Sequence, residues 1–358
     1  MRILIVTDAW EPQVNGVVRT LQATRRELER RGHQVALISP DQFRSIPCPT
    51  YGEIRLALAP RRKIAQRIAA FAPHSLHIAT EGPLGLAARR FCLDRGWAFT
   101  TAYHTQFPEY VARRTGLPAP CFWPYIRWFH RPARAILVST GRVARQLAGH
   151  GLDRTRLWGR GVDLDGFHPG APPHPAFADL PRPIQLYVGR VAVEKNIGAF
   201  LATRHPGSKV VVGGGPALER LRRDHPDALF LGALSGATLA SAYASADVFV
   251  FPSRTDTFGL VMIEALASGT PVAAYPVPGP LDVLSERTGA MDERLDHAIA
   301  RALTLDRRDC AAAARAFSWV ESAGQFEAAL VPVGPGPVRT GAAAAPRQDR
   351  GSGIASRC

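Results

Sequence analysis

The stretch VFVFPSRTDTFGLVMIEALASGTPV, residues 248–272, decides the fold class of this chain. An uninterrupted apolar run at 248–251 is followed by a polar loop, an apolar helical segment that ends at Gly269, and a second apolar run that starts at Pro271. Short runs that are apolar throughout are typical of parallel strands, whose two faces are both covered by crossover helices. The stretch therefore predicts one strand–helix–strand unit of an α/β domain.

The same alternation of apolar runs and helical patterns extends in both directions from this stretch. We expect strands at 3–6, 35–39, 77–79, 99–102, 136–139, 184–188, 209–212, 229–231, 248–251 and 271–274. A proline-rich segment interrupts the series, and the last residues are rich in Pro, Gly and Ala. The sequence predicts an α/β protein with two Rossmann-like doubly wound domains. The expected boundaries are an N-terminal domain at 1–166, a linker at 167–183, a C-terminal domain at 184–330 and a disordered tail at 331–358.

The charge of the chain is unevenly distributed. The 358 residues carry a formal net charge of +14. Residues 1–170 hold 25 Arg and Lys against 12 Asp and Glu, whereas residues 171–358 hold 19 against 18. A basic half beside a neutral half predicts that the first domain faces an anionic surface, which charge alone leaves open as a membrane, a nucleic acid or an acidic polymer.

Composition and spacing also exclude several classes of protein. The five cysteines are scattered without a C-x-x-C pair, which argues against a disulfide scaffold or a structural zinc site. The apolar run at 3–6 is far shorter than the core of a signal peptide, and no stretch approaches the roughly 18–20 apolar residues of a spanning helix. We expect a cytoplasmic protein, either free or peripheral on the inner face of the membrane.

Two loops at the ends of predicted strands could hold phosphate groups. Asn15 and Gly16 open a helix after the first strand, and free N–H groups at a helix N-terminus suit a phosphate, although a plain turn is the alternative. Gly189 and Arg190 end a later strand, and Lys195 follows five positions after Arg190. Two cations on one such loop can hold a pyrophosphate from two sides, and the alternative is a pair of solvated loop charges.

The third candidate site lies within the opening stretch. Glu264 is the only charge in the apolar segment 258–269, and a buried carboxylate is costly unless something binds it. Asp256 stands eight positions earlier, about 12 Å away if the helix is counted at about 1.5 Å per residue. The two carboxylates could hold separate hydroxyl-bearing parts of one long ligand, with its phosphate on the backbone N–H groups of 258–260. The alternative is that Glu264 pairs with a core arginine.

These motifs together carry a resemblance to a known family. The stretches are TDAWEPQVNGVVRTL, HIATEGPLG, YHTQFPEY, GRVAVEKN, GGGP and PSRTDTFGLVMIEALASGTPV. In this order and spacing, from residue 1 to about 330, the chain resembles glycosyltransferase family 4. The resemblance implies a retaining, metal-independent enzyme with the two-domain GT-B fold, whose domains face a central cleft. Within the family the chain is most similar to the GDP-mannose-dependent α-mannosyltransferases and to the sulfolipid and glucuronosyl-diacylglycerol synthases.

The resemblance also assigns roles to residues of this sequence. It implies that Arg190 and Lys195 bind the donor diphosphate, with Gly16 against it from the first domain. It implies that Glu264 binds the ribose hydroxyls and that Asp256 holds hydroxyls of the transferred sugar. The resulting prediction lists His104, Arg190, Lys195 and Asp256 as catalytic, and Gly16, Gly189, Arg190, Lys195, Phe258, Gly259, Leu260, Glu264, Gly232 and Leu234 as donor-binding. His104 would sit by the donor sugar, residues 232–234 would face the nucleobase, and 317–326 would cross back onto the first domain.

The chain departs from the family pattern at two positions. The family usually has glutamate where this chain has Asp256, which is one methylene shorter and weakens the inference about the donor sugar. The usual G-D-G-P turn is Gly213-Gly214-Gly215-Pro216 here and lacks the acid. Neither change removes a diphosphate ligand.

The resulting functional prediction is a hexosyltransferase that moves mannose from GDP-mannose onto a lipid or lipid-linked acceptor. The alternatives are a UDP-sugar-dependent enzyme that makes a glycolipid, and a nucleotide-sugar epimerase of the same fold. We expect no cofactor and no metal, an anionic membrane surface as a partner, and no nucleic acid. The basic residues 61–63 and 67 could lie on lipid headgroups, whereas the aromatic segment 121–130 is expected mainly to pack in the core.

Overall fold

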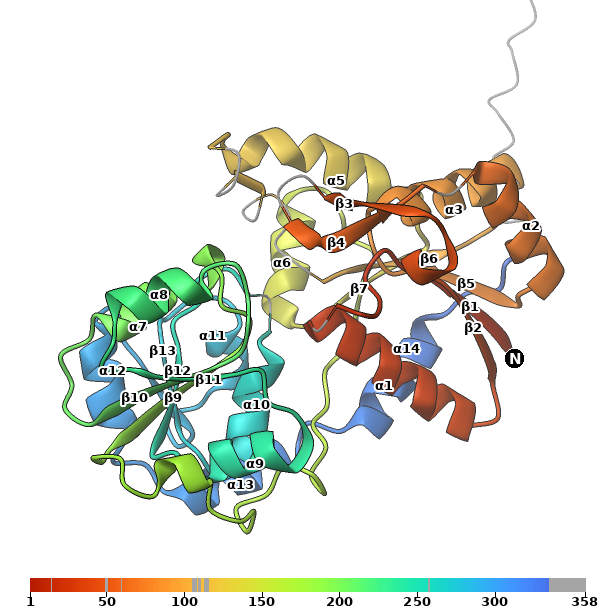
Figure 1. Cartoon of the computed structure of the whole chain (residues 1–358). Helices are drawn as coiled ribbons and strands as arrows, with labels where there is room; N and C mark the ends of the chain where they lie inside the picture. The colour runs from red at the N-terminus through yellow and green to blue at the C-terminus, as the bar shows by residue number, and fades with distance from the viewer. Residues whose placement is uncertain are drawn as a thin grey trace, which may run out of the picture.

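The chain forms two lobes, each built around one six-stranded sheet (Figure 1). The computed structural model describes residues 1–13, 15–48, 51–58, 60–104, 108, 111–112, 116–256 and 258–334. All strand pairs within the two six-stranded sheets are parallel. The predicted fold class, two doubly wound α/β domains, is confirmed.

The first sheet has the strand order β2-β1-β5-β6-β7-β8. Its strands are β1 (Arg2–Val6), β2 (Gln34–Ile38), β5 (Ser75–Ile78), β6 (Thr100–Tyr103), β7 (Ala135–Val138) and β8 (Thr155–Leu157). The helices of this lobe are α1 (Gly16–Arg30), α2 (Arg61–Phe71), α3 (Pro83–Asp94), α5 (Trp123–His130) and α6 (Gly141–Gly149), with 3-10 turns η1 (Pro40–Gln42) and η2 (Ala119–Phe122). The sequence analysis missed β8 and an antiparallel hairpin of β3 (Ser45–Cys48) and β4 (Tyr51–Ala57).

The second sheet has the strand order β11-β10-β9-β12-β13-β14. Its strands are β9 (Ile184–Val188), β10 (Ser208–Val212), β11 (Leu229–Gly232), β12 (Val248–Phe251), β13 (Val272–Ala274) and β14 (Gly289–Met291). The connecting elements are η4 (Val193–Lys195), α7 (Ile197–Leu201), α8 (Leu218–Asp224), α9 (Gly236–Ser245), α10 (Leu260–Ala267), α11 (Pro280–Val283), α12 (Leu295–Ala302) and α13 (Arg307–Ala314). The stretch that opened the sequence analysis is β12–α10–β13.

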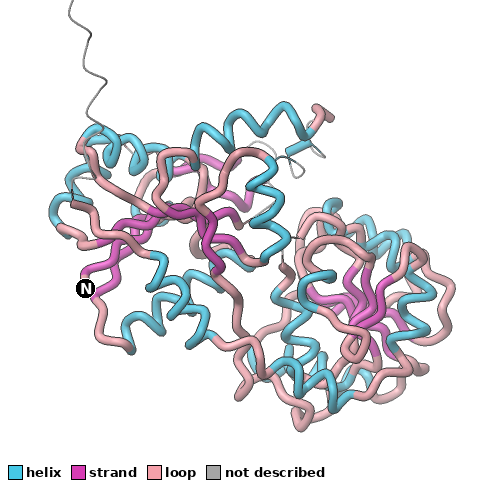
Figure 2. The backbone as a smooth tube through the Cα atoms, turned by 180° about the vertical axis from the view of Figure 1, so that it is seen from behind, coloured by secondary structure: helices cyan, strands magenta, loops and turns pink. Residues whose placement is uncertain are grey.

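Both sheets are covered by helices on their two faces, which explains why most residues of their strands are apolar (Figure 2). In β1, Leu4 and Val6 lie in one buried cluster, whereas Ile3 and Ile5 lie in another on the opposite face of the sheet. Successive side chains of a strand point to opposite faces, so a sheet that is buried on both sides needs an apolar residue at every position.

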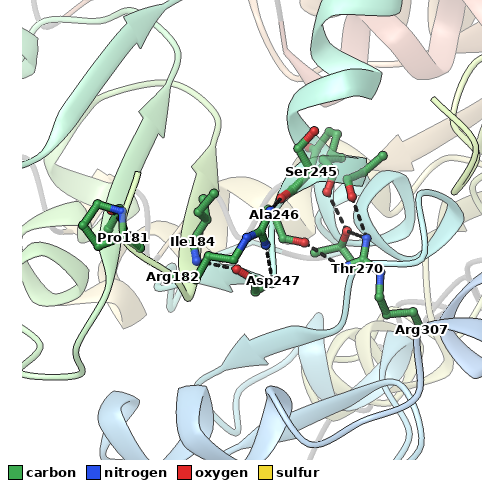
Figure 3. A network of polar contacts seen from close by, with 11 residues as sticks. Pro181, Arg182, Ile184, Ser245, Ala246, Asp247, Thr270 and Arg307 are labelled. Atoms are coloured by element: carbon green, nitrogen blue, oxygen red, sulfur yellow. Dashed lines mark hydrogen bonds and ion pairs between the residues drawn. The ribbon is translucent and has the colours of Figure 1, made fainter. Parts of the chain in front are cut away.

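The segment expected as a linker, 167–183, packs against the second lobe. Phe177, in the 3-10 turn η3 (Pro175–Phe177), is buried in the core of that lobe, and the Ser241 hydroxyl donates to the Pro172 carbonyl at 2.6 Å. At the end of the segment, Arg182 and the backbone N–H of Ile184 both donate to the carboxylate of Asp247, at 2.5 and 2.6 Å (Figure 3). The segment that links the two lobes is therefore packed on the second lobe along its length.

The same corner of the second lobe is tied to its last helices by Arg307. This guanidinium donates to the carbonyls of Ala246 and Ala244, at 2.6 and 2.7 Å, and to the Thr270 hydroxyl at 3.3 Å (Figure 3). The contacts join the start of α13 to the loops around β12 and β13, so they stabilise the edge of the sheet opposite the carboxyl ends of its strands.

The last described helix, α14 (Trp319–Ala329), belongs spatially to the first lobe (Figure 1). It packs along α1, Phe326 lies in the buried cluster that contains Ile3 and Ile5, and Pro332 forms a bridge with Ser75 of β5. The expected boundary at 330 therefore assigns to the second domain a helix that packs on the first. Residues 331–334 of the expected tail run beside β5, and 335–358 lie outside the described residues.

None of the helices in the described part of the chain has the length and apolar character that crossing a membrane requires.

Candidate functional site

The predicted site residues lie where both sheets change direction. In each sheet the chain first adds strands on one side of the first strand and then returns to its other side, so β1 and β5, and β9 and β12, flank a switch point. Ligands of doubly wound sheets bind outside the carboxyl ends of the strands at such points. The loop with Gly16 follows β1, the loop with Arg190 and Lys195 follows β9, and Asp256 follows β12.

Lys195 and Asp256 are brought into direct contact by the two loops of the second lobe. The Lys195 ammonium donates to both carboxylate oxygens of Asp256, at 2.6 and 2.8 Å. Arg190 donates from Nη2 to Glu194 at 2.6 Å and also acts electrostatically on Asp256. Both cations are about three-quarters buried, with exposed side-chain fractions of 24% for Arg190 and 23% for Lys195. Arg190 and Lys195 therefore belong to one charge cluster and are fixed by their acidic partners, which differs from a pair of solvated loop charges.

The ionisation of Asp256 follows from this cluster. Burial by itself would raise the pKa of the carboxyl. Lys195, a hydrogen bond from Ser253, and Arg190 together outweigh burial, so the pKa of Asp256 lies below its usual 3.8. Asp256 is therefore a carboxylate at neutral pH, and it holds Lys195 in one position.

Glu264 is buried on α10 and pairs with an arginine of the other lobe. Arg19, on α1, forms an ion pair through Nη1 with Oε1 of Glu264, and the Tyr243 hydroxyl donates to Oε2 at 3.1 Å. Burial raises the pKa of Glu264, and Arg19 and Tyr243 partly offset that rise. The pairing with an arginine matches the alternative reading of Glu264, but Arg19 lies across the junction of the lobes and is 37% exposed in its side chain. The carboxylate therefore lies where the two lobes meet.

The helix that carries Glu264 is shorter than expected, so the predicted distance of about 12 Å between Asp256 and Glu264 does not hold as calculated. The sequence analysis counted a continuous helical rise from Asp256, whereas α10 begins at Leu260 after Gly259, whose φ is +84°. A residue with a side chain is strained at that φ. The glycine therefore ends the loop from β12 and lets the chain turn into α10, and the rise of a helix cannot be applied to 256–259.

The predicted glycines lie at close approaches of the backbone. A Cβ on Gly16 would meet Leu260 of the other lobe at 3.6 Å, so the start of α1 and the start of α10 are neighbours. A Cβ on Gly189, whose φ is +149°, would meet the Tyr187 hydroxyl at 2.9 Å. Asn15 caps α1 by accepting from the N–H groups of Val17 and Val18, each at 3.0 Å.

The residues expected at the nucleobase follow β11, which lies two strands away from β9 in the sheet. Gly232 ends β11 with a φ of +72°, its carbonyl accepts from Gly213 at 2.7 Å, and Leu234 is half-buried against the core of the second lobe. Phe258 is buried, and its ring packs edge-to-face on Phe317 at 5.9 Å between centroids. No contact places these residues next to Lys195 or Glu264.

His104 follows β6 of the first lobe, and its side chain meets a buried arginine. Arg160 Nη2 lies 3.3 Å from His104 Nδ1, and the imidazole packs edge-to-face on Trp158 at 5.2 Å. Burial and then the charge of Arg160 lower the pKa of His104 well below its usual 6.5. Most of the YHTQFPEY motif beyond His104, namely 105–107 and 109–110, lies outside the described residues.

A cavity of about 280 Å³ lies between the lobes beside Arg160. Its walls come from the end of β7 and the start of α6, from the loop that bears Gly159 and Arg160, from the start of α14, and from Phe258 and Asp282 of the second lobe. Of the predicted site residues, Phe258 lines it. Arg142 of α6 and Asp282 form an ion pair across the junction, with Nε and Oδ1 3.4 Å apart.

Three residues of this region were missed by sequence reasoning: Arg19, Tyr243 and Arg160. Arg19 stands three positions after Gly16, so the helical period places both on one face of α1, and that spacing could have identified it. Tyr243 and Arg160 come from elements far from their partners along the chain. Arginine is too common here to mark Arg160, since only three of the 44 basic residues are lysines.

The basic and aromatic segments of the first lobe divide between core and surface. Ile64 and Ile68 of α2 are buried, so its apolar face packs in the core, whereas its exposed residues include Arg61, Arg62, Lys63 and Arg67. In α5, Trp123, Ile126 and Phe129 are buried, whereas Trp128 is 51% exposed with the Arg89 guanidinium 3.9 Å above its ring. Asp163, in the segment Asp163-Leu164-Asp165, accepts hydrogen bonds from the backbone N–H groups of residues 165 and 166, each at 3.2 Å.

Two family models match the chain in sequence order. Glycosyltransferase Family 4 matches residues 14–165, and Glycosyl transferases group 1 matches residues 182–305. The GDP-mannose-dependent alpha-mannosyltransferase of Mycolicibacterium smegmatis is 33% identical over 316 residues, which are 81% of this chain and 84% of the relative. The sulfoquinovosyl transferase SQD2 of Arabidopsis thaliana is 33% identical over 302 residues, which are 76% of this chain and 59% of the relative.

The solved structures extend the likeness to the arrangement of the two lobes. Sucrose-phosphate synthase from Thermosynechococcus elongatus superposes with a TM-score of 0.71 at 22% identity, over 91% of this chain and 97% of that chain. The sequence relatives show the family and the structural likeness shows the fold, which confirms the predicted resemblance. The chain belongs to glycosyltransferase family 4, and it is a hexosyltransferase with the GT-B fold.

Proposed function

We propose that this chain transfers mannose from GDP-mannose to a lipid or lipid-linked acceptor, with retention of the anomeric configuration and without a metal or other cofactor. The observation that carries the proposal is the 33% identity, over most of both chains, to a GDP-mannose-dependent alpha-mannosyltransferase. A second candidate is the transfer of a sugar from a UDP-sugar to a lipid acceptor. A sulfoquinovosyl transferase shares the same 33% identity with this chain, over 302 residues.

The charge cluster of the second lobe supports the donor side of the proposal. Breaking an anomeric C–O bond leaves negative charge on the departing diphosphate, which preorganised cations stabilise. The Lys195 ammonium has three N–H donors, of which Asp256 accepts two, so a third remains for a phosphate oxygen. Arg190 stands on the same loop, and Gly16 lies beside Leu260 at the junction of the lobes. Lys195 would then be fixed by Asp256 and bind the diphosphate.

The carboxylates support the binding of hydroxyl groups. Asp256 is ionised and lies beside the cations, so it can accept hydrogen bonds from the transferred sugar. Glu264 already accepts from Arg19 and Tyr243, and a ribose that bound Glu264 would compete with Arg19 for Oε1. We infer that ribose binding releases Arg19 toward the junction of the lobes, where it would add a positive charge near the diphosphate.

The charge distribution supports a membrane-facing first lobe and hence a lipid acceptor. Arg61, Arg62 and Lys63 are exposed together at the start of α2, in the half of the chain that carries nearly all of the excess positive charge. Basic clusters of this kind bind anionic lipid headgroups with about 1 kcal/mol for each Lys or Arg. We propose that the protein associates peripherally with an anionic inner membrane face from the cytoplasm, and not with nucleic acid.

The experiment that tests the donor is a thermal-shift and turnover panel on the full chain. GDP, UDP, GDP-mannose and several UDP-sugars are compared, because a nucleotide that binds the folded state raises the melting temperature. Turnover is then followed as nucleotide release in the presence of vesicles that contain candidate lipid acceptors, with and without EDTA. We expect stabilisation by GDP, mannosyl transfer to lipid, and no effect of EDTA. Stabilisation by UDP alone would favour the second candidate, and epimerised sugar from the donor alone would contradict both.

The matched variants are Lys195→Ala and Arg223→Ala. Each removes one positive charge from the second lobe, but Arg223 is exposed on α8, away from the cluster. We expect Lys195→Ala to abolish the shift caused by GDP-mannose and to melt below the wild type without nucleotide, because it leaves Asp256 unpaired, whereas Arg223→Ala keeps both the shift and the melting temperature. Equal donor affinity in the two variants would remove Lys195 from the site.

A further inference from the structure

We propose that Arg160 is a positioning residue of the transfer reaction, which holds the ring of His104 in the neutral tautomer that carries its proton on Nε2. His104 can then only donate a hydrogen bond from Nε2, and it cannot take a proton through Nδ1. The inference rests on the proposed function in one respect, namely that His104 faces the reacting sugar. The tautomer itself is a property of this chain alone.

The contact between Arg160 and His104 permits one assignment of the proton. Arg160 Nη2 lies 3.3 Å from His104 Nδ1. A guanidinium has five N–H donors, no acceptor, and does not deprotonate in proteins. Nδ1 must therefore be the acceptor in this contact, which excludes a proton on Nδ1. A neutral imidazole with an unprotonated Nδ1 carries its proton on Nε2.

Arg160 is fixed in this orientation by its own loop. Its Nη1 donates to the carbonyls of Trp158 and Gly159, at 2.5 and 3.0 Å, and its guanidinium lies 4.9 Å from the Trp158 ring. The residue is 7% exposed, and within the described ranges no carboxylate forms an ion pair with it. The carbonyl groups accept hydrogen bonds from the guanidinium without neutralising its charge, so Arg160 disfavours a second positive charge on His104.

The loop of Arg160 is in turn held by α14, which follows the second lobe in the chain. Gln325 accepts from the Gly159 N–H at 2.7 Å, and Ser322 donates to the Gly159 carbonyl at 2.8 Å. A Cβ on Gly161 would lie 2.3 Å from the Trp319 nitrogen, so the loop touches the helix backbone directly. The position of Arg160 therefore depends on α14, which packs on the first lobe. The tautomer of His104 depends on α14 through Arg160.

Among the described residues, the groups that act electrostatically on His104 favour its neutral form. Burial lowers the pKa of His104 most, followed by Arg160, His77 and His130. The pKa of His77 is itself lowered to about 3 by burial, so it faces His104 as a neutral ring. Glu81 accepts a hydrogen bond from His130, with Oε1 3.1 Å from Nε2. A neutral ring that presents only N–H recognises an oxygen acceptor, such as a sugar hydroxyl or a phosphate oxygen.

The direct test is the protonation of the ring nitrogens by 15N NMR of histidine-labelled full-length protein, with the His104 signals assigned by comparison with His104→Gln. We expect an unprotonated Nδ1 and a protonated Nε2 across the range in which an ordinary histidine titrates, around pH 6.5. In Arg160→Met both nitrogens should move toward signals averaged over the two neutral tautomers, while burial still keeps the ring neutral in this range. Arg156→Met, an exposed arginine of β8, is the matched control and should leave His104 unchanged. A protonated Nδ1 in the wild type would overturn the proposal.

The functional test is a double-mutant cycle with a conservative variant. We expect Arg160→Met to lower kcat about 10- to 100-fold with little change in KM for the donor. In the His104→Ala background the same substitution should cost less than about twofold, because positioning acts through His104. Arg160→Lys, which keeps a donor, should recover part of the rate. Equal losses in both backgrounds would show that Arg160 does not act through His104.

The two measurements separate this inference from the proposed function. Should another nucleotide-sugar prove to be the donor, the NMR result stands and the kinetic cycle is run with that donor. If Arg160→Met does not fold, as a thermal melt would show, the wild-type spectrum and Arg160→Lys still decide the tautomer.

Discussion

The charged residues of the candidate site do not stand alone; each is held by an opposite charge or by a buried polar group. Lys195 is bound by Asp256, Arg190 by Glu194, and Glu264 by Arg19. Pairs that are largely withdrawn from water lose much when one partner is removed, since the other charge remains buried. For each substitution in this cluster, the melting temperature should therefore be measured together with the activity, so that a loss of stability is not taken for a loss of catalysis.

Asp8 is the buried carboxyl for which the structure predicts a pH dependence of stability. It follows β1 and accepts from the N–H groups of Leu84 and Gly85 and from the Thr80 hydroxyl, yet burial raises its pKa from 3.8 to about 6. The folded protein thus binds this proton more tightly than the unfolded chain. The stability that Asp8 contributes is full below about pH 4 and is lost as the pH rises through about 6.

The comparison of wild type with Asp8→Asn isolates that contribution. The free energy of unfolding of the wild type minus that of the variant should fall by on the order of 3 kcal/mol between about pH 4 and about pH 7. Urea denaturation at a series of pH values measures it. A difference that is the same at every pH would show that Asp8 titrates alike in both states.

Among the elements, α14 has a role that its position in the chain does not suggest. It follows the second lobe in sequence, packs on α1 and β7 of the first, and closes one wall of the cavity between the lobes. Phe326 is fully buried and lies 4.9 Å from both the His77 and Trp158 rings, between centroids. The helix thus completes the core of the first lobe.

Phe326→Ala should therefore destabilise the first lobe and not the second. We expect a loss of about 3–5 kcal/mol, as for other buried phenylalanines. Hydrogen–deuterium exchange should quicken in β1 and β5, whereas β9 and β12 keep their protection. Val320→Ala is the control on the same helix, because Val320 is 58% exposed. Faster exchange in β9 alone would contradict the assignment of α14 to the first lobe.

Over the whole molecule, the two lobes share a fold but not a charge. The first half of the chain carries nearly all of the net positive charge, and the second is almost neutral. The electrostatic field of the first lobe attracts an anionic surface, whereas the nearly neutral second lobe is not drawn to it.

This asymmetry predicts binding to anionic vesicles through the first lobe. Replacing Arg61, Arg62 and Lys63 with Glu should weaken binding to vesicles rich in phosphatidylglycerol by roughly 100-fold or more, from about 1 kcal/mol for each basic residue. The matched control replaces Arg220, Arg222 and Arg223 of α8 with Glu and should bind nearly as the wild type does. Binding should fall with added salt. Binding to nucleic acid but not to vesicles would reverse the interpretation of the charge.

The doubly wound fold could be predicted because its signals are local. Both sheets need strands that are apolar throughout, and runs such as 184–188 and 248–251 are visible without any knowledge of their partners. Edge strands are different: β8 mixes polar with apolar residues and was missed, as were the edge strand β14 and the separate hairpin of β3 and β4. The motifs of the site were also local, since each follows a strand and lies in a short loop.

The sequence by itself determined the family, the alternation of strands and helices, and which loops carry charge, because each depends on residues that are neighbours along the chain. Tertiary structure alone decided the partners: Arg19 for Glu264, Arg160 for His104, and α14 for the first sheet. The first two contacts join residues that are 245 and 56 positions apart, and α14 meets Arg31 across 296 positions. In a chain with so many arginines, only the packing of the two lobes selects which arginine meets which acid or ring.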